Sequence, residues 1–221
     1  MDSDQVSNYK GEEAERYESQ VSEIAWHGHE ILFGLMYEFV KSGELLLDIG
    51  IGTGLSSLLF HKAGLQVSGF DNSAEMIKGC HSKEFSGQII QHDLKNVPYP
   101  FQSNSINHVI SLGVLNFFSN LLPVFQESSR IIKKDGIFGF TVEEKKPEQE
   151  HQYTLHVNEE TNDEIQPFDI VLYRHSDEDV RVLLKNMGFS VLKEYEFLAD
   201  RYPKQEIEIF LKIYVTKNQG S

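Results

Sequence analysis

A glycine-rich stretch that follows an apolar segment constrains the fold of this chain more than any other feature. Leu45–Ile49 is apolar apart from Asp48, and three alternating glycines follow it: Gly50, Gly52 and Gly54. Alternating glycines allow the backbone to turn sharply from a strand into a helix, and the missing Cβ atoms leave the backbone amides open to a ligand. The sequence therefore predicts a strand, a turn that can bind a nucleotide-like cofactor, and a helix.

Two further acidic residues follow the next two predicted strands. Asp71 comes directly after Gln66–Phe70, and Asp93 comes after Gln88–Gln91 and one intervening histidine. In open α/β sheets, ligands bind outside the carboxyl ends of the strands, where a carboxylate can accept hydrogen bonds from a ribose. An aspartate after a strand is also a common helix cap or turn residue. That alternative does not predict the same placement on three successive strands, so the pattern favours a binding site.

Two kinds of cofactor fit this pattern, a dinucleotide and S-adenosylmethionine. The dinucleotide motif G-x-G-x-x-G/A needs a third small residue that lets the helix pack closely beneath a pyrophosphate. Leu55 stands at that position when the motif is counted from Gly50, and it is neither glycine nor alanine. The ribose-binding position of Asp71 suits both cofactors. The third position weakens the case for a dinucleotide without excluding it.

The same residues resemble the D/E-x-G-x-G-x-G motif of class I S-adenosylmethionine-dependent methyltransferases, of the small-molecule type known as methyltransferase domain 11 or 25. The resemblance extends over about residues 12–217. Asn96–Phe101 with Asn104–Ser111 is similar to the family stretch LPFPDNSFDVVIS, and Ile131–Phe138 is similar to its LLKPGG turn. Asn107 replaces the usual aspartate of the first stretch. The resemblance implies S-adenosylmethionine as the cofactor.

The resemblance also implies roles for individual residues. Asp48 would organise the glycine turn and the methionine ammonium, Asp71 the ribose hydroxyls and Asp93 the adenine amino group, while Tyr17 would reach the methionine carboxylate. The expected cofactor-binding residues are Tyr17, Asp48, Gly50, Gly52, Gly54, Asp71, Asn72, Met76, His92, Asp93, Leu94, Ser111 and Leu112.

The residues that bind the methyl acceptor are less constrained by the sequence. We expect Trp26, Asn116 and His175 to face the substrate, and Asn116 stands where relatives often carry histidine. His175, Tyr17 and His27 are the candidates for a proton acceptor, and none of them stands out. Aligning the two reactants can supply most of the catalysis of methyl transfer without a general base.

The C-terminal region distinguishes this fold from a dehydrogenase. Two predicted strands, Ser190–Leu198 and Glu206–Val215, are joined by a connection too short for parallel pairing, which needs a dozen residues or more. They must therefore form an antiparallel hairpin, as in the methyltransferase sheet. The expected fold class is α/β, a Rossmann-like seven-stranded mixed sheet with helices on both faces and a C-terminal antiparallel hairpin.

We expect a single methyltransferase domain over residues 1–221. Residues 1–43 would form an N-terminal helical cap, 44–144 the cofactor-binding core, 145–175 an inserted substrate cap, and 176–221 a C-terminal helix and hairpin. In the insertion, Tyr153–Val157 and Asp169–Tyr173 are predicted strands between charged runs. Inserted loops at the carboxyl edge of a sheet commonly determine specificity.

Composition bears on the acceptor and the compartment. The net charge is −14, which disfavours a nucleic acid substrate because the phosphate backbone requires clustered Lys and Arg. The only cysteine, Cys80, suits a reducing compartment. With a polar N-terminus and no long apolar run, we expect a cytoplasmic protein with no secretory leader and no membrane span. His27 and His29 lack further ligands at a suitable spacing, so no metal is expected.

The sequence thus predicts methylation of a small molecule, with the acceptor atom and the oligomeric state left open. Two alternatives remain. One is a catalytically silent cofactor-binding module that partners another subunit. The other is a nicotinamide-dependent oxidoreductase, which would bind NADH and ignore S-adenosylhomocysteine.

Overall fold

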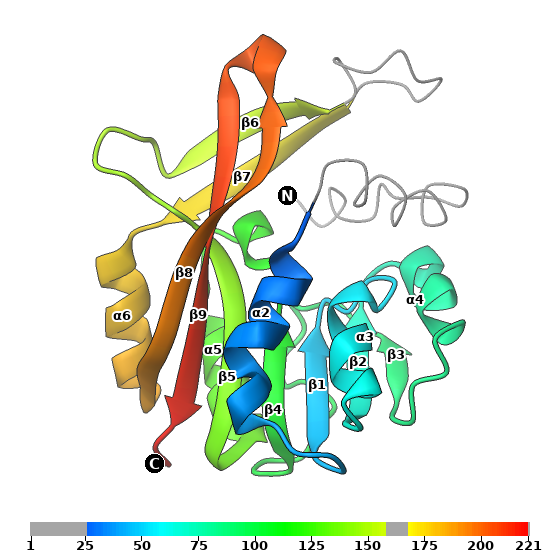
Figure 1. The fold of residues 1–221 in the computed structure, drawn as a ribbon. Helices are drawn as coiled ribbons and strands as arrows, with labels where there is room; N and C mark the ends of the chain where they lie inside the picture. The colour runs from blue at the N-terminus through cyan, green and yellow to red at the C-terminus, as the bar shows by residue number, and fades with distance from the viewer. Residues whose placement is uncertain (1–25, 158–167, 221) are drawn as a thin grey trace.

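A central mixed sheet organises the computed structural model, which describes residues 26–157 and 168–220 (Figure 1). Five parallel strands lie in the order β3-β2-β1-β4-β5. Their bounds are β1 Leu45–Ile49, β2 Gln66–Asp71, β3 Ile89–Gln91, β4 Ile106–Ser111 and β5 Ile132–Glu144. Because these strands are parallel, their carboxyl ends lie at one edge of the sheet, and the predicted acidic residues lie at this edge.

The C-terminal hairpin completes the expected seven-stranded core. β9 (Ile207–Asn218) runs antiparallel to β5, and β8 (Phe189–Tyr202) runs antiparallel to β9. The predicted hairpin is confirmed, with strands several residues longer than expected. They are joined by the short 3-10 helix η4 (Pro203–Gln205).

The insertion forms a second hairpin, which joins the sheet instead of lying apart from it. β6 (Gln152–Val157) pairs antiparallel with β7 (Phe168–His175), and the end of β7 pairs in parallel with the end of β5. β5 is 13 residues long and can therefore pair with three neighbouring strands. Its middle pairs with β4 and β9, and its last residues pair with β7. The described residues therefore contain nine strands, seven in the core and two in the insertion.

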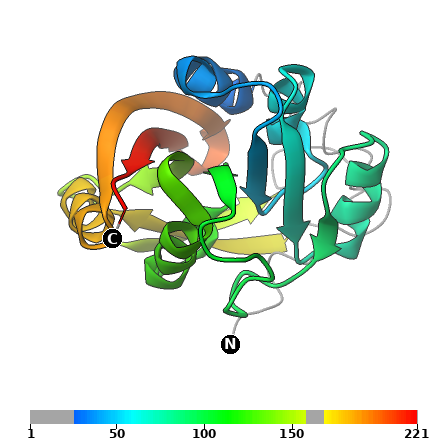
Figure 2. The ribbon, with the colours of Figure 1, turned by 90° about the horizontal axis from the view of Figure 1, so that it is seen from below.

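Helices cover both faces of the sheet (Figure 2). One face carries α2 (Gly28–Met36), α3 (Leu55–Lys62) and α4 (Ala74–His81), whose buried side chains share one apolar cluster. The other face carries α5 (Leu122–Ile131) and α6 (Asp177–Asn186), which pack in a second cluster. The short 3-10 helices η2 (Tyr37–Phe39) and η3 (Leu115–Phe117) complete the described helices apart from η4.

Apolar side chains alternate between the two faces of the sheet along its strands, which explains why helices cover both faces. In β1, Leu46 belongs to the first cluster, whereas Leu47 and Ile49 belong to the second, as the two-residue period of a strand requires. α2 packs closely on β5, since a Cβ atom at Gly139 would lie 2.4 Å from the sulfur of Met36. Glycine at this position of β5 therefore lets the helix approach the sheet.

No helix of residues 26–157 and 168–220 is both long and apolar enough to cross a membrane.

The two hairpins contact each other beyond the carboxyl edge of the parallel strands, at the top of Figure 1. The Gln205 side-chain amide donates to the His156 carbonyl oxygen at 2.8 Å, and the His156 amide donates to the Gln205 side-chain oxygen at 3.1 Å. Apolar residues of both hairpins also belong to one cluster, among them Leu155, Ile170, Phe197 and Leu211. The insertion is thereby held above the strand ends, where a substrate cap was predicted.

Candidate functional site

The glycine turn between β1 and α3 is tied to the end of β2. Gly50, Gly52 and Gly54 have φ values of 77°, 54° and 84°, in the left-handed region that favours glycine. The amides of Gly50 and Ile51 both donate to the Phe70 carbonyl oxygen, at 2.9 and 3.0 Å. A Cβ atom at Gly50 would lie 2.5 Å from Val114, so glycine also lets the turn approach the loop after β4.

Asp71 connects the glycine turn to the start of α4. One carboxylate oxygen accepts a hydrogen bond from the Gly52 amide at 2.9 Å, and the other accepts one from the Ser73 amide at 2.9 Å. Burial raises the pKa of Asp71, while backbone hydrogen bonds from Ser73, Gly52 and Asn72 oppose that rise. The side chain is 9% exposed and lines the pocket described below.

Asp48 lies behind the glycine turn and does not line the pocket. It is 1% exposed and accepts a hydrogen bond from the Ser57 hydroxyl at 2.7 Å, which connects β1 to the first turns of α3. Burial raises its pKa to about 7, and the nearby charge of Asp71 adds to the rise. In this structure Asp48 supports the turn from beneath.

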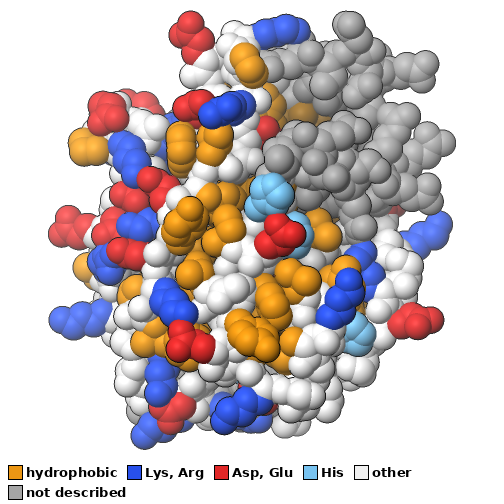
Figure 3. Space-filling view, viewed as in Figure 1, with side chains coloured by type: hydrophobic (Ala, Val, Ile, Leu, Met, Phe, Trp, Pro, Cys, Tyr) orange, Lys and Arg blue, Asp and Glu red, His pale blue; other side chains and the backbone are white. Residues whose placement is uncertain are grey.

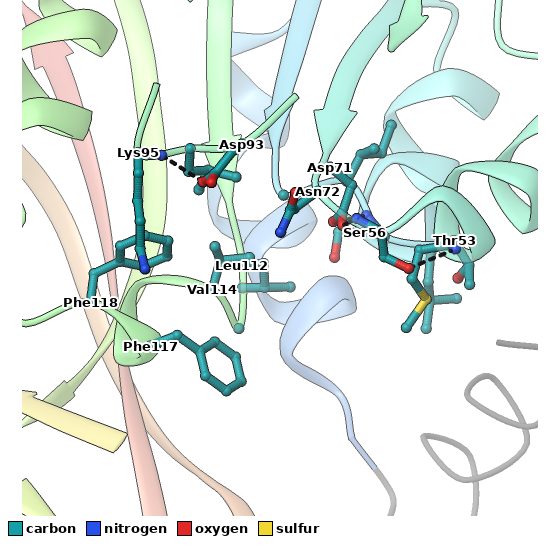
Figure 4. A pocket seen from close by; sticks show the side chains of 18 of the residues that line it. Thr53, Ser56, Asp71, Asn72, Asp93, Lys95, Leu112, Val114, Phe117 and Phe118 are labelled. Carbon is teal, nitrogen blue, oxygen red and sulfur yellow. Dashed lines mark hydrogen bonds between the residues drawn. The ribbon is translucent and has the colours of Figure 1, made fainter. Parts of the chain in front are cut away.

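A cavity of about 240 Å³ opens at the carboxyl edge of the sheet (Figure 4). Asp71 and Asn72 lie on one side of it, and Lys95, Phe117 and Phe118 lie on the other. Asp93 accepts a hydrogen bond from the Lys95 amide at 2.9 Å, which closes a tight turn after β3. Acidic groups and an aromatic wall therefore border the same cavity.

Most of the predicted cofactor residues lie around this cavity. Those that line it are Gly50, Gly52, Asp71, Asn72, Met76, Asp93, Leu94 and Leu112. Trp26, expected to face the substrate, also lines it. Tyr17 lies outside the described residues.

Three other predicted cofactor residues lie behind the cavity wall, as Asp48 does. Gly54 begins α3 in the left-handed conformation, where a Cβ atom would meet Phe85 at 2.5 Å. The His92 ring packs against Phe70, and the Ser111 hydroxyl donates to the Ile49 carbonyl oxygen at 2.9 Å. These side chains hold the wall together and do not border the cavity.

The remaining substrate and proton-acceptor candidates do not border this cavity. His175 lies on a separate hollow between α5 and α6, with its ring centroid 5.6 Å from that of His151. Burial lowers the pKa of His175 to about 4, and His151 contributes to the decrease. Asn116 is 8% exposed, and its side-chain oxygen has no hydrogen-bond partner among the described residues. His27 is exposed and contacts Glu30 at 2.7 Å.

Several lining residues were not predicted from the sequence. They are Ile51, Thr53, Leu55, Ser56, Ser73, Lys95, Gly113, Val114, Phe117, Phe118 and Ile170. The position of Phe117 and Phe118 just after a parallel strand is a signal that could have identified them. Ile170 comes from β7, and its place in the wall depends on how the insertion folds back, which no local pattern shows.

A family comparison agrees with this arrangement. Residues 47–140 match the family model described as a methyltransferase domain. Residues 47–140 therefore carry a methyltransferase domain, and the fold is the one that class I methyltransferases share. The resemblance predicted from the sequence is therefore confirmed, and the family and the solved neighbours indicate S-adenosylmethionine as the cofactor. The glycine turn, where a Cβ atom at Gly52 would meet nothing within 4 Å, and the carboxylates beside it fit such a ligand.

Individual relatives resemble this chain to different degrees in sequence and in structure. The demethylmenaquinone methyltransferase of Tropheryma whipplei is 30% identical over 97 residues, which cover 44% of this chain and 41% of that one. A methyltransferase of Methanosarcina mazei matches with a TM-score of 0.70 at 13% identity, over 85% of this chain and 98% of that one. A structure from a Haloferax volcanii complex of a methyltransferase with its Trm112 activator matches with a TM-score of 0.71 at 18% identity, over 98% of both chains. This chain spans about two fifths of the length of the curated relatives it matches.

Proposed function

We propose that this methyltransferase transfers a methyl group from S-adenosylmethionine to a small-molecule acceptor. The observation that carries the proposal is one cavity with two kinds of wall. The glycine turn, Asp71 and Asp93 border this cavity, and so do Trp26 and the aromatic residues after β4. The cofactor supplies a methyl group on a positively charged sulfur, and the protein's task is to align the acceptor with it.

In this proposal the strand ends hold the cofactor. Asp71 binds the ribose hydroxyls, Asp93 the adenine amino group, and the glycine turn lies against the methionine part. Asp71 is already fixed by two backbone amides, so its carboxylate keeps its orientation before the cofactor binds. A preorganised carboxylate reduces the ordering that binding requires.

The apolar part of the cavity would hold the acceptor. Trp26 borders it and packs edge-on against Phe197 of β8, with ring centroids 5.4 Å apart. Ile170 of β7 forms another part of the wall, together with Phe117 and Phe118. Walls of this kind exclude water and hold a nucleophile in line with the methyl group. Their composition favours an apolar or aromatic acceptor.

Surface charge supports a small acceptor over a nucleic acid. On the face shown in Figure 3, basic and acidic side chains are interleaved over the β8 and α6 side. The pairing is visible in the ion pairs of Arg181 with Asp177 and Glu194, and of Lys212 with Asp177. Basic side chains paired in this way are poorly placed to bind a phosphate backbone. We also propose a cytoplasmic location, because a single cysteine, Cys80, suits a reducing compartment.

An acceptor panel tests this proposal. The full chain is incubated with S-adenosylmethionine and apolar acids, phenols and quinols, beside RNA and protein fractions, and release of S-adenosylhomocysteine is measured. Turnover with members of the small-molecule set supports the proposal. Turnover with RNA or protein alone contradicts the acceptor class.

The Haloferax volcanii neighbour favours a second candidate, a methyltransferase whose activity depends on a partner. That neighbour was solved with an activator protein, and its fold matches this chain over nearly the whole length. A chain that binds S-adenosylhomocysteine but releases none with any acceptor until a partner protein is added would favour this candidate.

Replacing Ile170 with alanine is expected to raise the KM for the acceptor about tenfold. The substitution removes part of the apolar wall, and the lost burial of such a side chain is worth about 1.5–3 kcal/mol. A loss of about 1.4 kcal/mol in binding free energy corresponds to a factor of ten, which gives the expected change in the acceptor KM. The KM for S-adenosylmethionine should change less than about twofold, because Ile170 lies on β7, away from the glycine turn. Steady-state kinetics with each substrate varied in turn measures both.

Leu172→Ala is the matched control for this variant. Leu172 is 3% exposed on the same strand and belongs to the same apolar cluster, but it does not line the cavity. It should lower the melting temperature about as much as Ile170→Ala without changing either KM. Equal effects of the two variants on the acceptor KM would contradict an acceptor wall at Ile170.

A further inference from the structure

Tyr99 lies between the two strand ends that carry the acidic residues of the cavity. It belongs to the loop between β3 and β4 and is 2% exposed. Its ring packs against Phe70, with centroids 4.8 Å apart, and edge-on against His92, with centroids 5.9 Å apart. Phe70 and His92 directly precede Asp71 and Asp93 in the chain. One buried ring thus contacts the residues that position both carboxylates.

The Tyr99 hydroxyl holds the turn after β3 directly. It donates a hydrogen bond to the Leu94 carbonyl oxygen at 3.0 Å. Leu94 follows Asp93 and lines the cavity with it. Burial raises the pKa of Tyr99, so the phenol stays protonated and remains a donor over the whole neutral range. A phenylalanine here would pack in the same place but leave the Leu94 oxygen without this donor.

α5 fixes the backbone of Tyr99 from the other side. The Tyr99 amide donates to the Glu127 carboxylate at 2.7 Å, and Arg130 donates to the Tyr99 carbonyl oxygen at 3.1 Å. Glu127 and Arg130 form an ion pair with each other at 2.6 Å, and Arg130 also donates to the Phe101 carbonyl oxygen at 2.8 Å. Charge-assisted hydrogen bonds of this kind are stronger than neutral ones. The loop therefore has a fixed position relative to α5.

We propose that Tyr99 is a positioning residue that sets the spacing between Asp71 and the Asp93–Leu94 turn, and thereby the fit of the adenosine part of the cofactor. The inference rests on the proposed function, because it assigns adenosine to these two strand ends. Tyr99 touches no part of the cavity itself and acts through Phe70, His92 and Leu94.

Tyr99→Phe tests this inference, because it keeps the ring and removes only the hydroxyl. The Kd for S-adenosylhomocysteine, measured by calorimetry on the full chain, is expected to rise about tenfold, since a buried acceptor loses its donor. The preference for S-adenosylhomocysteine over S-inosylhomocysteine, which lacks the adenine amino group, is expected to fall. At saturating cofactor, kcat should stay within about twofold of the wild-type value, because the methyl acceptor is bound elsewhere.

Tyr214→Phe is the matched control. Tyr214 is also fully buried, and its hydroxyl donates to Asp177 at 2.5 Å, at the start of α6 and not at the cavity. It should lower the melting temperature as Tyr99→Phe does, while leaving the Kd and the adenine preference unchanged. If Tyr99→Phe binds S-adenosylhomocysteine like the wild type, or if both variants weaken binding equally, the inference is overturned. A wild-type chain that binds no S-adenosylhomocysteine overturns the proposed function, and the inference with it.

Discussion

Replacing Asp71 with alanine is expected to weaken binding of S-adenosylhomocysteine by about a hundredfold or more. The carboxylate accepts hydrogen bonds from the amides of Gly52 and Ser73, so its loss frees the glycine turn and the start of α4 as well as the proposed ribose contacts. A hydrogen bond to a charged group contributes about 1.5–3 kcal/mol, and a hundredfold change in Kd corresponds to about 2.7 kcal/mol. Isothermal titration calorimetry measures the change.

Two further variants distinguish a loss of cofactor binding from a loss of folding. Asp71→Asn keeps one acceptor oxygen but places an amide donor against a backbone amide, so we expect an intermediate loss of affinity. Asp179→Ala removes a carboxylate from the first turn of α6, away from the cavity, and should leave the Kd unchanged. An Asp71→Ala chain that is folded by circular dichroism and retains the wild-type Kd would refute the site.

The sequence predicted the parts of the site that depend on local patterns. The glycine turn, β2 with Asp71 and β3 before Asp93 are all encoded by short runs of apolar residues that end in characteristic polar ones. The C-terminal hairpin was predictable for a different reason, since a short connection cannot join parallel neighbours. Such features require no knowledge of distant contacts.

Other parts of the site depend on packing between segments far apart in the chain. A strand-end position alone cannot tell whether an aspartate such as Asp48 points into the cavity or, as here, toward Ser57 behind it. Likewise, His175 ends β7 beside α6 because β7 joins β5, and this pairing moves it away from the main cavity. Ile170 enters the wall through the same tertiary arrangement.

The position of Asp48 has a consequence for the dependence of stability on pH. Its pKa rises from 3.8 to about 7 because the folded chain removes it from water. The folded state therefore binds its proton more tightly than the unfolded state between about pH 4 and pH 7. Stability decreases as the pH rises through this window and levels off above it, because the unfolded chain loses the proton first. This sign is opposite to that of a carboxylate stabilised by a salt bridge.

Asp48→Asn is expected to remove this pH dependence. The amide oxygen can still accept the hydrogen bond from Ser57, and no charge has to be buried at high pH. The free energy of unfolding of the variant, relative to the wild type, should therefore increase by about 4 kcal/mol between pH 4 and pH 8, at about 1.4 kcal/mol for each pKa unit. Urea unfolding at several pH values, followed by circular dichroism, measures the difference.

Asp135→Asn provides a control of opposite sign. Asp135 is exposed and paired with Lys217 at 2.7 Å, which lowers its pKa, so its contribution to stability is lost as the pH falls. Asparagine also tolerates the left-handed backbone at this position, where φ is 66°. Relative to the wild type, Asp135→Asn should therefore lose stability as the pH rises toward about 4 and change little above it, whereas Asp48→Asn should gain stability between about pH 4 and pH 7. If Asp48→Asn, like Asp135→Asn, follows the wild-type curve from pH 4 to pH 8, Asp48 is not a neutral buried acid, and support of the glycine turn from beneath must come from an ionised carboxylate.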